Sequence, residues 1–316
     1  MNRRVTLVDI AKATGYSVNS VSRALMDAPD ISDKTKRKIK DVADELGYIP
    51  NMAAASLKKG NSKIIGVLYD DLLNPYYNTI CCYLERVLSQ KGYMMIYYRK
   101  TDFDLNLYNS MISRNLEGII SFLVPTDEVE RRINIQKFPT VIIGRKAKYI
   151  SSVYADDIKI GVLAAKSLIE AGCSKPIYIG EGYDIEICRL RADGFVKELA
   201  SKNIKPQLYF CGSGAKFDEV VENCLQNVNF DSIFCFSDLL AFKALKYLMK
   251  YKRNDVVVVG VDNVQNEIPI PANLMSIGQN KEEIVNDVVE LLFNQISGID
   301  METKFIKKEI FIVKEN

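Results

Sequence analysis

The first 47 residues hold three short segments in which apolar side chains recur every three or four positions, the spacing of a helix with one buried face. Thr6 and Ser17 precede the first two segments as candidate N-caps, and Ser32 or Asp33 precedes the third. Gly15 separates the first two segments by a tight turn, so the pattern predicts a helix-turn-helix completed by a third helix. The residues expected to face its core are Leu7, Ile10, Ala11, Val21, Ala24, Leu25, Ile39, Val42, Ala43 and Leu46.

From residue 63 onward, short apolar runs alternate with amphipathic stretches, which is typical of parallel βαβ units. The first group of runs is KIIGVLY, MMIYY, GIISF and PTVIIG, and the second is KPIYIG, QLYF, DSIFCF and VVVVG. A break near 154–157 precedes a predicted helix over 158–171, and late strands are predicted around 275–279 and 307–313. We therefore expect an α/β body of two Rossmann-like lobes, the first about 62–155 and the second about 156–276, with the chain recrossing near 278 and 305.

The amino-acid composition excludes most of the common catalytic mechanisms. The 316 residues include no histidine, which excludes Ser-His-Asp and Cys-His catalysis and imidazole metal ligation. The 7 cysteines are scattered without a C-x-x-C pair, so we expect reduced, mostly buried thiols. We predict no catalytic residue, no metal and no cofactor.

Charge is distributed unevenly along the chain. Residues 1–63 hold 12 Lys+Arg against 7 Asp+Glu, whereas the rest hold 30 against 33. The basic N-terminal part is where a polyanion such as DNA is expected to bind. No apolar segment has the length of a signal or membrane-spanning helix, so we expect a cytoplasmic protein with no membrane partner.

The outer face of the second predicted helix has the chemistry of base recognition. Asparagine and arginine pair well with adenine and guanine edges in a major groove. A merely solvated helix face is the alternative, but the turn before it and the local basicity favour base contact. The outer residues are Val18, Asn19, Ser20, Ser22 and Arg23.

These residues belong to a longer motif. The segment VTLVDIAKATGYSVNSVSRALMDAPDISDKTKRKIKDVADELGYIPNMAAASLKKG resembles the DNA-binding headpiece of the lac repressor/galactose repressor (LacI/GalR) family. The T-L-x-D-I-A start, the S-x-x-x-V-S-R helix, the L-G-Y-x-P-N turn and the A-x-S-L end carry the resemblance. It implies that Val18, Asn19 and Arg23 contact bases. It also implies, with a simple capping role as the alternative for each, DNA-backbone contacts from Thr6, Ser17, Ser20, Ser22, Ser32 and Thr35.

The stretch after the three helices is alanine-rich but too short to be a stable isolated helix. By the resemblance, two such hinge helices pair in the minor groove, where Leu57 inserts between base pairs and Lys58 and Lys59 lie beside phosphate. A flexible linker is the alternative. We expect a headpiece at 1–49, a hinge helix and linker at 50–61, and an effector-binding and dimerisation domain at 62–316.

Ligands of open α/β sheets bind beyond the C-terminal ends of the strands, which selects a set of polar side chains in the body. We expect these side chains to face a common cleft. They are Asp70, Asp71, Asn74, Tyr76, Tyr77, Arg99, Arg145, Glu181, Ser237, Asp238, Asp262 and Asn263.

The body resembles the effector domain of the same family, which is akin to periplasmic sugar-binding proteins. An N-P-Y-Y turn, an R-x-x-G-F motif from Arg191 and a G-x-D-N motif ending at Asn263 carry this resemblance. It implies that Arg191 and Asp262 bind the effector, although the two could instead pair with each other. Near Ser213, where many relatives place an aromatic residue, the chain has only small residues, which leaves the ligand class open. The predicted effector-binding residues are Tyr76, for which a core position is equally open, Tyr77, Arg145, Arg191, Ser237, Asp262 and Gln279.

The sequence therefore predicts a homodimeric repressor that binds a pseudopalindromic DNA operator and is controlled by a small-molecule effector, a sugar or related metabolite. No heptad repeat follows Val313, which favours a dimer over a tetramer. The alternatives are a cytoplasmic solute-binding protein and an α/β enzyme with an appended DNA-binding module. The chain contains no G-x-x-x-x-G-K-[ST] or G-x-G-x-x-G loop to favour the enzyme.

Overall fold

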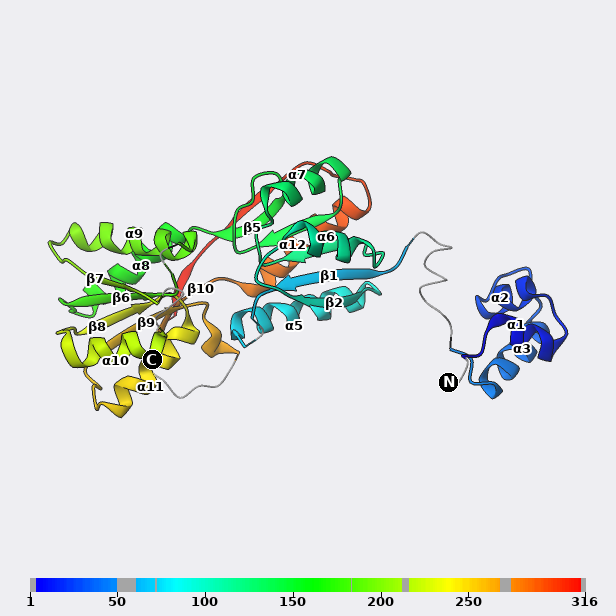
Figure 1. Ribbon diagram of the computed structural model, residues 1–316, viewed down its shortest axis with the longest axis horizontal. Helices are drawn as coiled ribbons and strands as arrows, with labels where there is room; N and C mark the ends of the chain where they lie inside the picture. Colours follow the sequence, from blue (N-terminus) through cyan, green and yellow to red (C-terminus); the bar gives the residue numbers. More distant parts are fainter. Residues whose placement is uncertain are drawn as a thin grey trace. The chain divides into compact units, whose positions relative to one another are not determined.

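The computed structural model describes residues 4–49, 61–71, 73–182, 184–211, 216–267 and 274–313. They form two units, Met1–Ser62 and Lys63–Asn316 (Figure 1). Residues 50–60 of the predicted hinge and linker, with Leu57, Lys58 and Lys59, lie outside the described residues, as does Ser213.

The N-terminal unit is the predicted helix-turn-helix with its third helix. It consists of α1 (Leu7–Thr14), α2 (Val18–Leu25) and α3 (Asp33–Glu45). Its core is made by Ile10, Val21, Ala24 and Ile39, all fully buried. Leu46, which we expected in this core, is 40% exposed because it follows the last turn of α3.

The first lobe of the body is built on a parallel sheet with strand order β11-β5-β4-β3-β1-β2. Its strands are β1 (Ile64–Tyr69), β2 (Met94–Arg99), β3 (Gly118–Ser121), β4 (Thr140–Ile143), β5 (Ser151–Ala155) and β11 (Phe305–Lys308). Its helices are α5 (Pro75–Gln90), α6 (Leu105–Ile112), α7 (Asp127–Gln136) and α12 (Lys281–Ile296). Helix α12 packs against α5 and against β3, β4 and β5, so a late segment of the chain completes the core of the first lobe.

The second lobe has the strand order β12-β10-β9-β8-β6-β7, in which only β12 is antiparallel to its neighbour. Its strands are β6 (Pro176–Gly180), β7 (Gln207–Phe210), β8 (Ser232–Cys235), β9 (Val257–Val261), β10 (Met275–Gly278) and β12 (Phe311–Val313). Its helices are α8 (Asp157–Glu170), α9 (Glu186–Ala200), α10 (Phe217–Asn227), α11 (Asp238–Lys250) and the 3-10 turn η1 (Val264–Asn266). The predicted two-lobed α/β body is confirmed (Figure 1).

Two details of the body differ from expectation. Strand β5 was not among the predicted strands, because its sequence SSVYA opens with two serines rather than an apolar run. Both serines are buried, and the Ser152 hydroxyl donates to the carbonyl of Ile150 at 2.9 Å and accepts from the amide of Ala147 at 3.1 Å. The predicted late strand over 307–313 is two strands in different sheets, so the crossing expected near 305 lies instead between Lys308 and Phe311.

Helices α8 and α9 lie backbone against backbone. A methyl group added at Gly161 would lie 2.0 Å from the carbonyl oxygen of Arg191, and one added at Gly194 would lie 2.0 Å from that of Ile158. Only glycine permits this approach, which brings the start of α8 beside the middle of α9. Among the described residues, none of the helices has the length and apolar character needed to cross a membrane.

Candidate functional site

The exposed face of α2 carries the three predicted base-contacting residues. Val18 is 42% exposed, and Asn19 and Arg23 are also exposed. A guanidinium nitrogen of Arg23 lies 2.6 Å from an Asp30 carboxylate oxygen, and both side chains are almost half exposed. An ion pair this exposed is typically worth about 0–1 kcal/mol, so it leaves the guanidinium able to exchange Asp30 for another acceptor.

Several hydroxyls predicted to contact the DNA backbone also cap helices. The amide and hydroxyl of Thr6 both donate to Asp9. Ser17 accepts from the amide of Ser20 at 3.1 Å, and Ser32 accepts from that of Thr35 at 3.3 Å. Ser17 and Ser32 therefore cap their helices, and Thr6 forms a capping box with Asp9, while the three exposed hydroxyls keep further hydrogen-bonding capacity.

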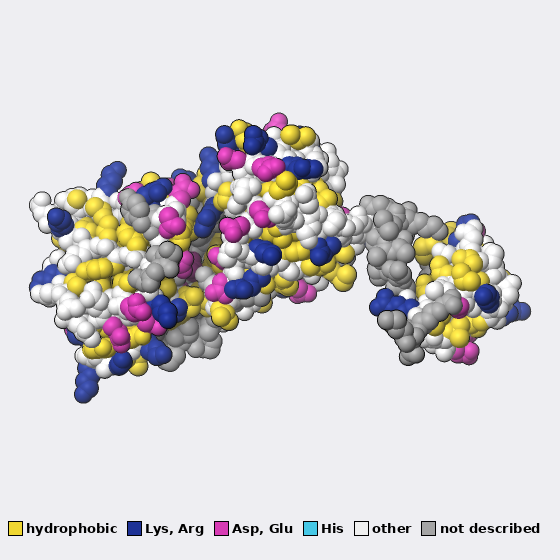
Figure 2. All heavy atoms as spheres, in the orientation of Figure 1, with side chains coloured by type: hydrophobic (Ala, Val, Ile, Leu, Met, Phe, Trp, Pro, Cys, Tyr) yellow, Lys and Arg dark blue, Asp and Glu magenta, His cyan; other side chains and the backbone are white. Residues whose placement is uncertain are grey.

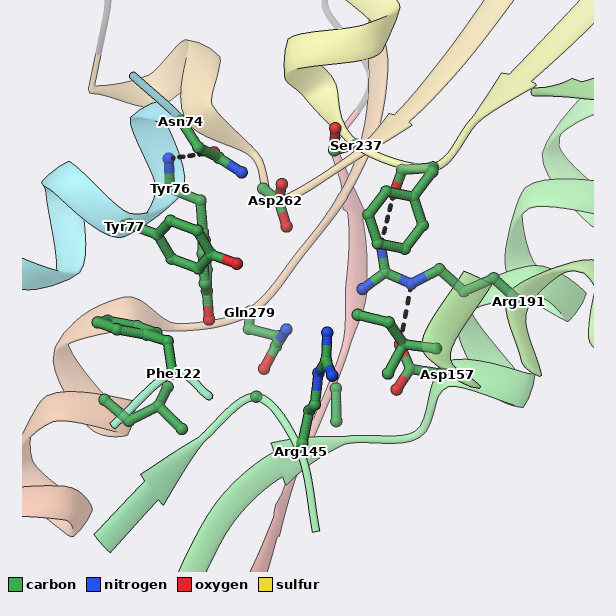
Figure 3. A pocket seen from close by; sticks show the side chains of 15 residues that line it. Asn74, Tyr76, Tyr77, Phe122, Arg145, Asp157, Arg191, Ser237, Asp262 and Gln279 are labelled. Carbon is green, nitrogen blue, oxygen red and sulfur yellow. Dashed lines mark hydrogen bonds and ion pairs between the residues drawn. The ribbon is translucent and has the colours of Figure 1, made fainter. Parts of the chain in front are cut away.

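A pocket of the body lies where the C-terminal ends of strands from both lobes meet (Figure 3). Its lining includes every predicted effector-binding residue: Tyr76, Tyr77, Arg145, Arg191, Ser237, Asp262 and Gln279. Asn74, Phe122, Asp157, Ile187 and Phe236 also line it. The expectation that ligands bind beyond the C-terminal ends of the strands thus identified most of the polar residues that line this pocket. Binding of an effector there stays a prediction.

The first turn of α5 presents two tyrosines to the pocket. Asn74 caps this helix by accepting the Tyr76 amide at 3.0 Å, and Pro75 fixes its first residue. The Tyr76 and Tyr77 rings meet edge to face at 5.9 Å, and Tyr77 packs 4.8 Å from Phe122. Burial raises the pKa of both tyrosines, so their hydroxyls stay protonated and can donate.

Arg191 is held in place by groups of the second lobe. Its Nε donates to Asp157 at 2.8 Å, and its guanidinium also donates to the carbonyl of Phe236 and lies 4.5 Å from the centre of that ring (Figure 3). Burial lowers the pKa of Arg191, but the carboxylates of Asp157 and Asp262 outweigh burial and raise it, so the group stays charged. The alternative in which Arg191 pairs directly with Asp262 is wrong, because its ion-pair partner is Asp157.

Asp157 was not among the predicted site residues. It is the first residue of α8, and its neighbour Asp156 does the capping by accepting the Lys159 amide at 3.0 Å. Burial raises the pKa of Asp157, and Arg191 opposes that rise. The available signal was the Asp-Asp pair immediately before the predicted helix at 158–171, since one acidic residue can cap the helix and leave the other free.

Arg145 and Asp262 face the pocket from opposite lobes (Figure 3). Arg145 follows β4, and among the residues that the structure describes it makes no ion pair within 4 Å. Burial raises the pKa of Asp262, with Arg191 as the largest opposing influence. These groups offer a ligand donors from both arginines, of which Arg191 is held in place, and an acceptor from Asp262.

Six residues expected in the common cleft do not line this pocket: Asp70, Asp71, Arg99, Glu181, Asp238 and Asn263. Arg99 is exposed at the end of the edge strand β2. Asp238 is the first residue of α11 and is fully buried, while Ser237 before it caps the helix. No group of three or more Asp, Glu or Cys side chains within the described ranges could hold a metal ion.

Figure 2 shows basic and acidic side chains interspersed over the visible face of the body.

Comparison with known proteins finds bacterial transcriptional regulators that are similar to this chain. Residues 6–51 match the family model "Bacterial regulatory proteins, lacI family". The chain is 29% identical to the HTH-type transcriptional regulator MalR of Clostridium butyricum, over 99% of this chain and 98% of that protein. It is 27% identical to the sucrose operon repressor of Lactococcus lactis subsp. lactis, over 95% of this chain and 96% of that protein.

Solved structures share the fold over the same length. A LacI family transcriptional regulator from Silicibacter pomeroyi superposes with a TM-score of 0.81 at 22% identity, covering 98% of both chains. The lac repressor dimer bound to operator and the anti-inducer ONPF gives a TM-score of 0.78 at 20% identity, covering 99% of this chain and 98% of that chain.

Proposed function

We propose that the chain is a member of the lacI family of bacterial regulatory proteins, and that it is a sequence-specific DNA-binding transcriptional repressor controlled by a small-molecule effector. Its N-terminal helix-turn-helix binds a DNA operator through Val18, Asn19 and Arg23. Its body binds a sugar or related metabolite. A regulator that reads bacterial DNA acts in the cytoplasm, and we assign it no catalytic step.

The observation that carries the DNA-binding part is the division of α2 into two faces. Val21 and Ala24 are fully buried, whereas Val18, Asn19 and Arg23 are exposed on a helix whose N-cap directly follows a tight turn. This is the arrangement with which recognition helices enter a major groove. We propose that the chain binds DNA as a dimer. A two-fold symmetric dimer requires two related half-sites, so the proposed operator is pseudopalindromic.

The effector part rests on the pocket chemistry. Two arginines, two aspartates, two side-chain amides, a serine and two protonated tyrosines surround a space that is also lined by Phe122 and Phe236. Oriented donors and acceptors beside aromatic rings suit a ligand that carries several hydroxyls on an apolar ring face. The sucrose operon repressor is a relative whose name includes a sugar, which agrees with this ligand class.

Arg23→Ala is expected to lower operator affinity by about 1–3 kcal/mol and to relax the preference at one base pair of each half-site, because a bidentate arginine contact to guanine is lost. Gel-shift titrations at fixed salt on the preferred duplex and its single-base variants measure both effects. Arg37→Ala is the control, since Arg37 is an exposed arginine on α3. Unchanged discrimination between bases in Arg23→Ala would remove Arg23 from base recognition.

Sugar binding is expected to raise the melting temperature of the full chain, because a ligand that binds only the native state stabilises it by about 2.7 kcal/mol at a hundredfold excess over Kd. Sucrose, maltose, D-ribose and adenine serve as probes in a thermal-shift series. A rise of several degrees with one sugar is expected. If adenine alone gave a rise, the effector would be a nucleobase rather than a sugar.

A further inference from the structure

The pocket residue Asp262 lies in a strained turn. Asp262 has φ 107° and Asn263 has φ 47°, so two consecutive residues with side chains occupy the left-handed region directly after β9. Such conformations are unfavourable for residues other than glycine and persist only where the surroundings hold them. The direction of the Asp262 carboxylate therefore depends on whatever fixes this turn.

Three consecutive amides of the turn are bound by buried acceptors. The Asp262 amide donates to the carbonyl of Ile277 at 2.9 Å. The Asn263 amide donates to the Ser276 hydroxyl at 2.9 Å, and the Val264 amide donates to Asp238 at 2.8 Å. The Ser276 hydroxyl in turn donates to Asp238 at 2.7 Å, and both of these side chains are fully buried.

Asp238 is pressed against the strand that leads into the turn. A methyl group added at Gly260 would lie 2.1 Å from the Asp238 carboxylate oxygen Oδ1, which explains why the G-x-D-N motif begins with glycine. Asp238 is the first residue of α11, and the preceding residue, Ser237, lines the pocket. At two places in the chain a pocket residue is therefore followed directly by a buried polar residue. The first pair is Ser237 and Asp238, and the second is Asp262 and Asn263.

A lysine from the other lobe completes the arrangement. Lys281 is the first residue of α12, whose apolar face belongs to the first lobe, and its side chain is 3% exposed. Its ammonium donates to the carbonyl of Asn263 at 2.8 Å and to Glu267 at 3.1 Å. The strained turn is therefore held from the second lobe by Asp238 and Ser276 and from the first lobe by Lys281.

We propose that Asp238, Ser276 and Lys281 are positioning residues for effector binding. They line no part of the pocket, and they hold the Asp262–Asn263 turn so that the Asp262 carboxylate faces the ligand. This inference rests on the proposed effector function of the pocket. Because Lys281 begins a helix of the first lobe, the orientation of Asp262 depends on how the two lobes are arranged, which couples ligand contact to lobe position.

Ser276→Ala tests the proposal against the matched variant Ser167→Ala. Ser167 is as buried as Ser276, and its hydroxyl donates to the carbonyl of Leu163 at 3.0 Å within α8. In the full chain, we expect Ser276→Ala to weaken binding of sucrose, maltose or D-ribose at least tenfold, measured by calorimetry, and Ser167→Ala to change it less than twofold. We also expect amide hydrogen exchange of the peptide that contains Asn263 and Val264 to accelerate at least tenfold in ligand-free Ser276→Ala. In ligand-free Ser167→Ala, the exchange rate of this peptide should stay that of the wild type.

A second pair of variants covers the case in which Ser276→Ala does not fold. Lys281→Met is expected to reproduce both effects, and Lys281→Arg, which keeps a cationic donor, is expected to restore both at least in part. Unchanged exchange in Ser276→Ala and Lys281→Met overturns the proposal, and so does faster exchange with unchanged sugar affinity. If none of the three sugars binds the wild type, the sugar assignment fails, while the exchange of the turn still supports or overturns the positioning role.

Discussion

Arg191→Ala is expected to destabilise the body by about 3–5 kcal/mol, because removing one partner of a buried ion pair leaves the other charge without compensation. The Nε of Arg191 lies 2.8 Å from Asp157, and each side chain is only 9% exposed. The variant is also expected to lose the thermal shift given by the effector, since the guanidinium lines the pocket. Urea unfolding followed by circular dichroism measures the first effect.

Arg86→Ala is the control for this experiment. Arg86 pairs with Glu282 at 2.8 Å, but the two side chains are 56% and 59% exposed, so a loss of about 0–1 kcal/mol is expected. Equal losses in the two variants would contradict the assignment of Arg191 as the charge that compensates Asp157.

The loss of unfolding free energy in Arg191→Ala is expected to depend on pH. Burial already raises the pKa of Asp157, and removing Arg191 takes away the largest opposing influence. A carboxyl with a raised folded-state pKa binds more protons folded than unfolded, so its ionised form destabilises the fold as pH rises. The loss relative to wild type should therefore be smaller at pH 5 than at pH 8.

Gly194→Ala is expected to cost about 3 kcal/mol or more, at the upper end of overpacking effects, because the added methyl group meets backbone rather than a movable side chain. It would lie 2.0 Å from the carbonyl oxygen of Ile158, so α8 and α9 must separate. Separation also displaces Arg191 relative to Asp157, and effector binding should weaken with stability. Urea unfolding and sugar titration check the two effects.

Asp193→Ala is the matched control, since Asp193 is the exposed neighbour of Gly194 on the same helix. Alanine favours a helix more than aspartate does, so this variant should stay within about 0.5 kcal/mol of wild type. A Gly194→Ala protein as stable as Asp193→Ala would mean that the two helices do not touch through their backbones.

Local patterns predicted the elements whose signals are local. The three N-terminal helices follow from their caps and apolar spacing, and most strands of the body follow from short apolar runs. Strand β5 escaped because its buried face is made partly by serine hydroxyls, whose hydrogen bonds come from residues such as Ala147 that no periodicity identifies. The late strands were merged because Phe305–Lys308 and Phe311–Val313 are separated by only two residues, although they pair in different sheets.

The pocket was predictable to the extent that strand ends define it. That rule brought together Tyr76, Arg145 and Asp262, which are far apart in sequence but follow strands of the two lobes. It failed for Arg99, because the edge strand that carries it ends away from the pocket. The pairing of Arg191 with Asp157 depends on the close packing of α8 and α9, a tertiary contact that single-sequence reasoning does not provide.

The most direct test of the whole account is selection of binding sites from a randomised duplex library by the full wild-type chain, with heparin as a polyanion competitor at matched salt. The account predicts enrichment of one sequence with approximate two-fold symmetry, and loss of preference at one position of each half-site in Arg23→Ala. Recovery of duplexes with no shared sequence, and with no advantage over heparin, would contradict it.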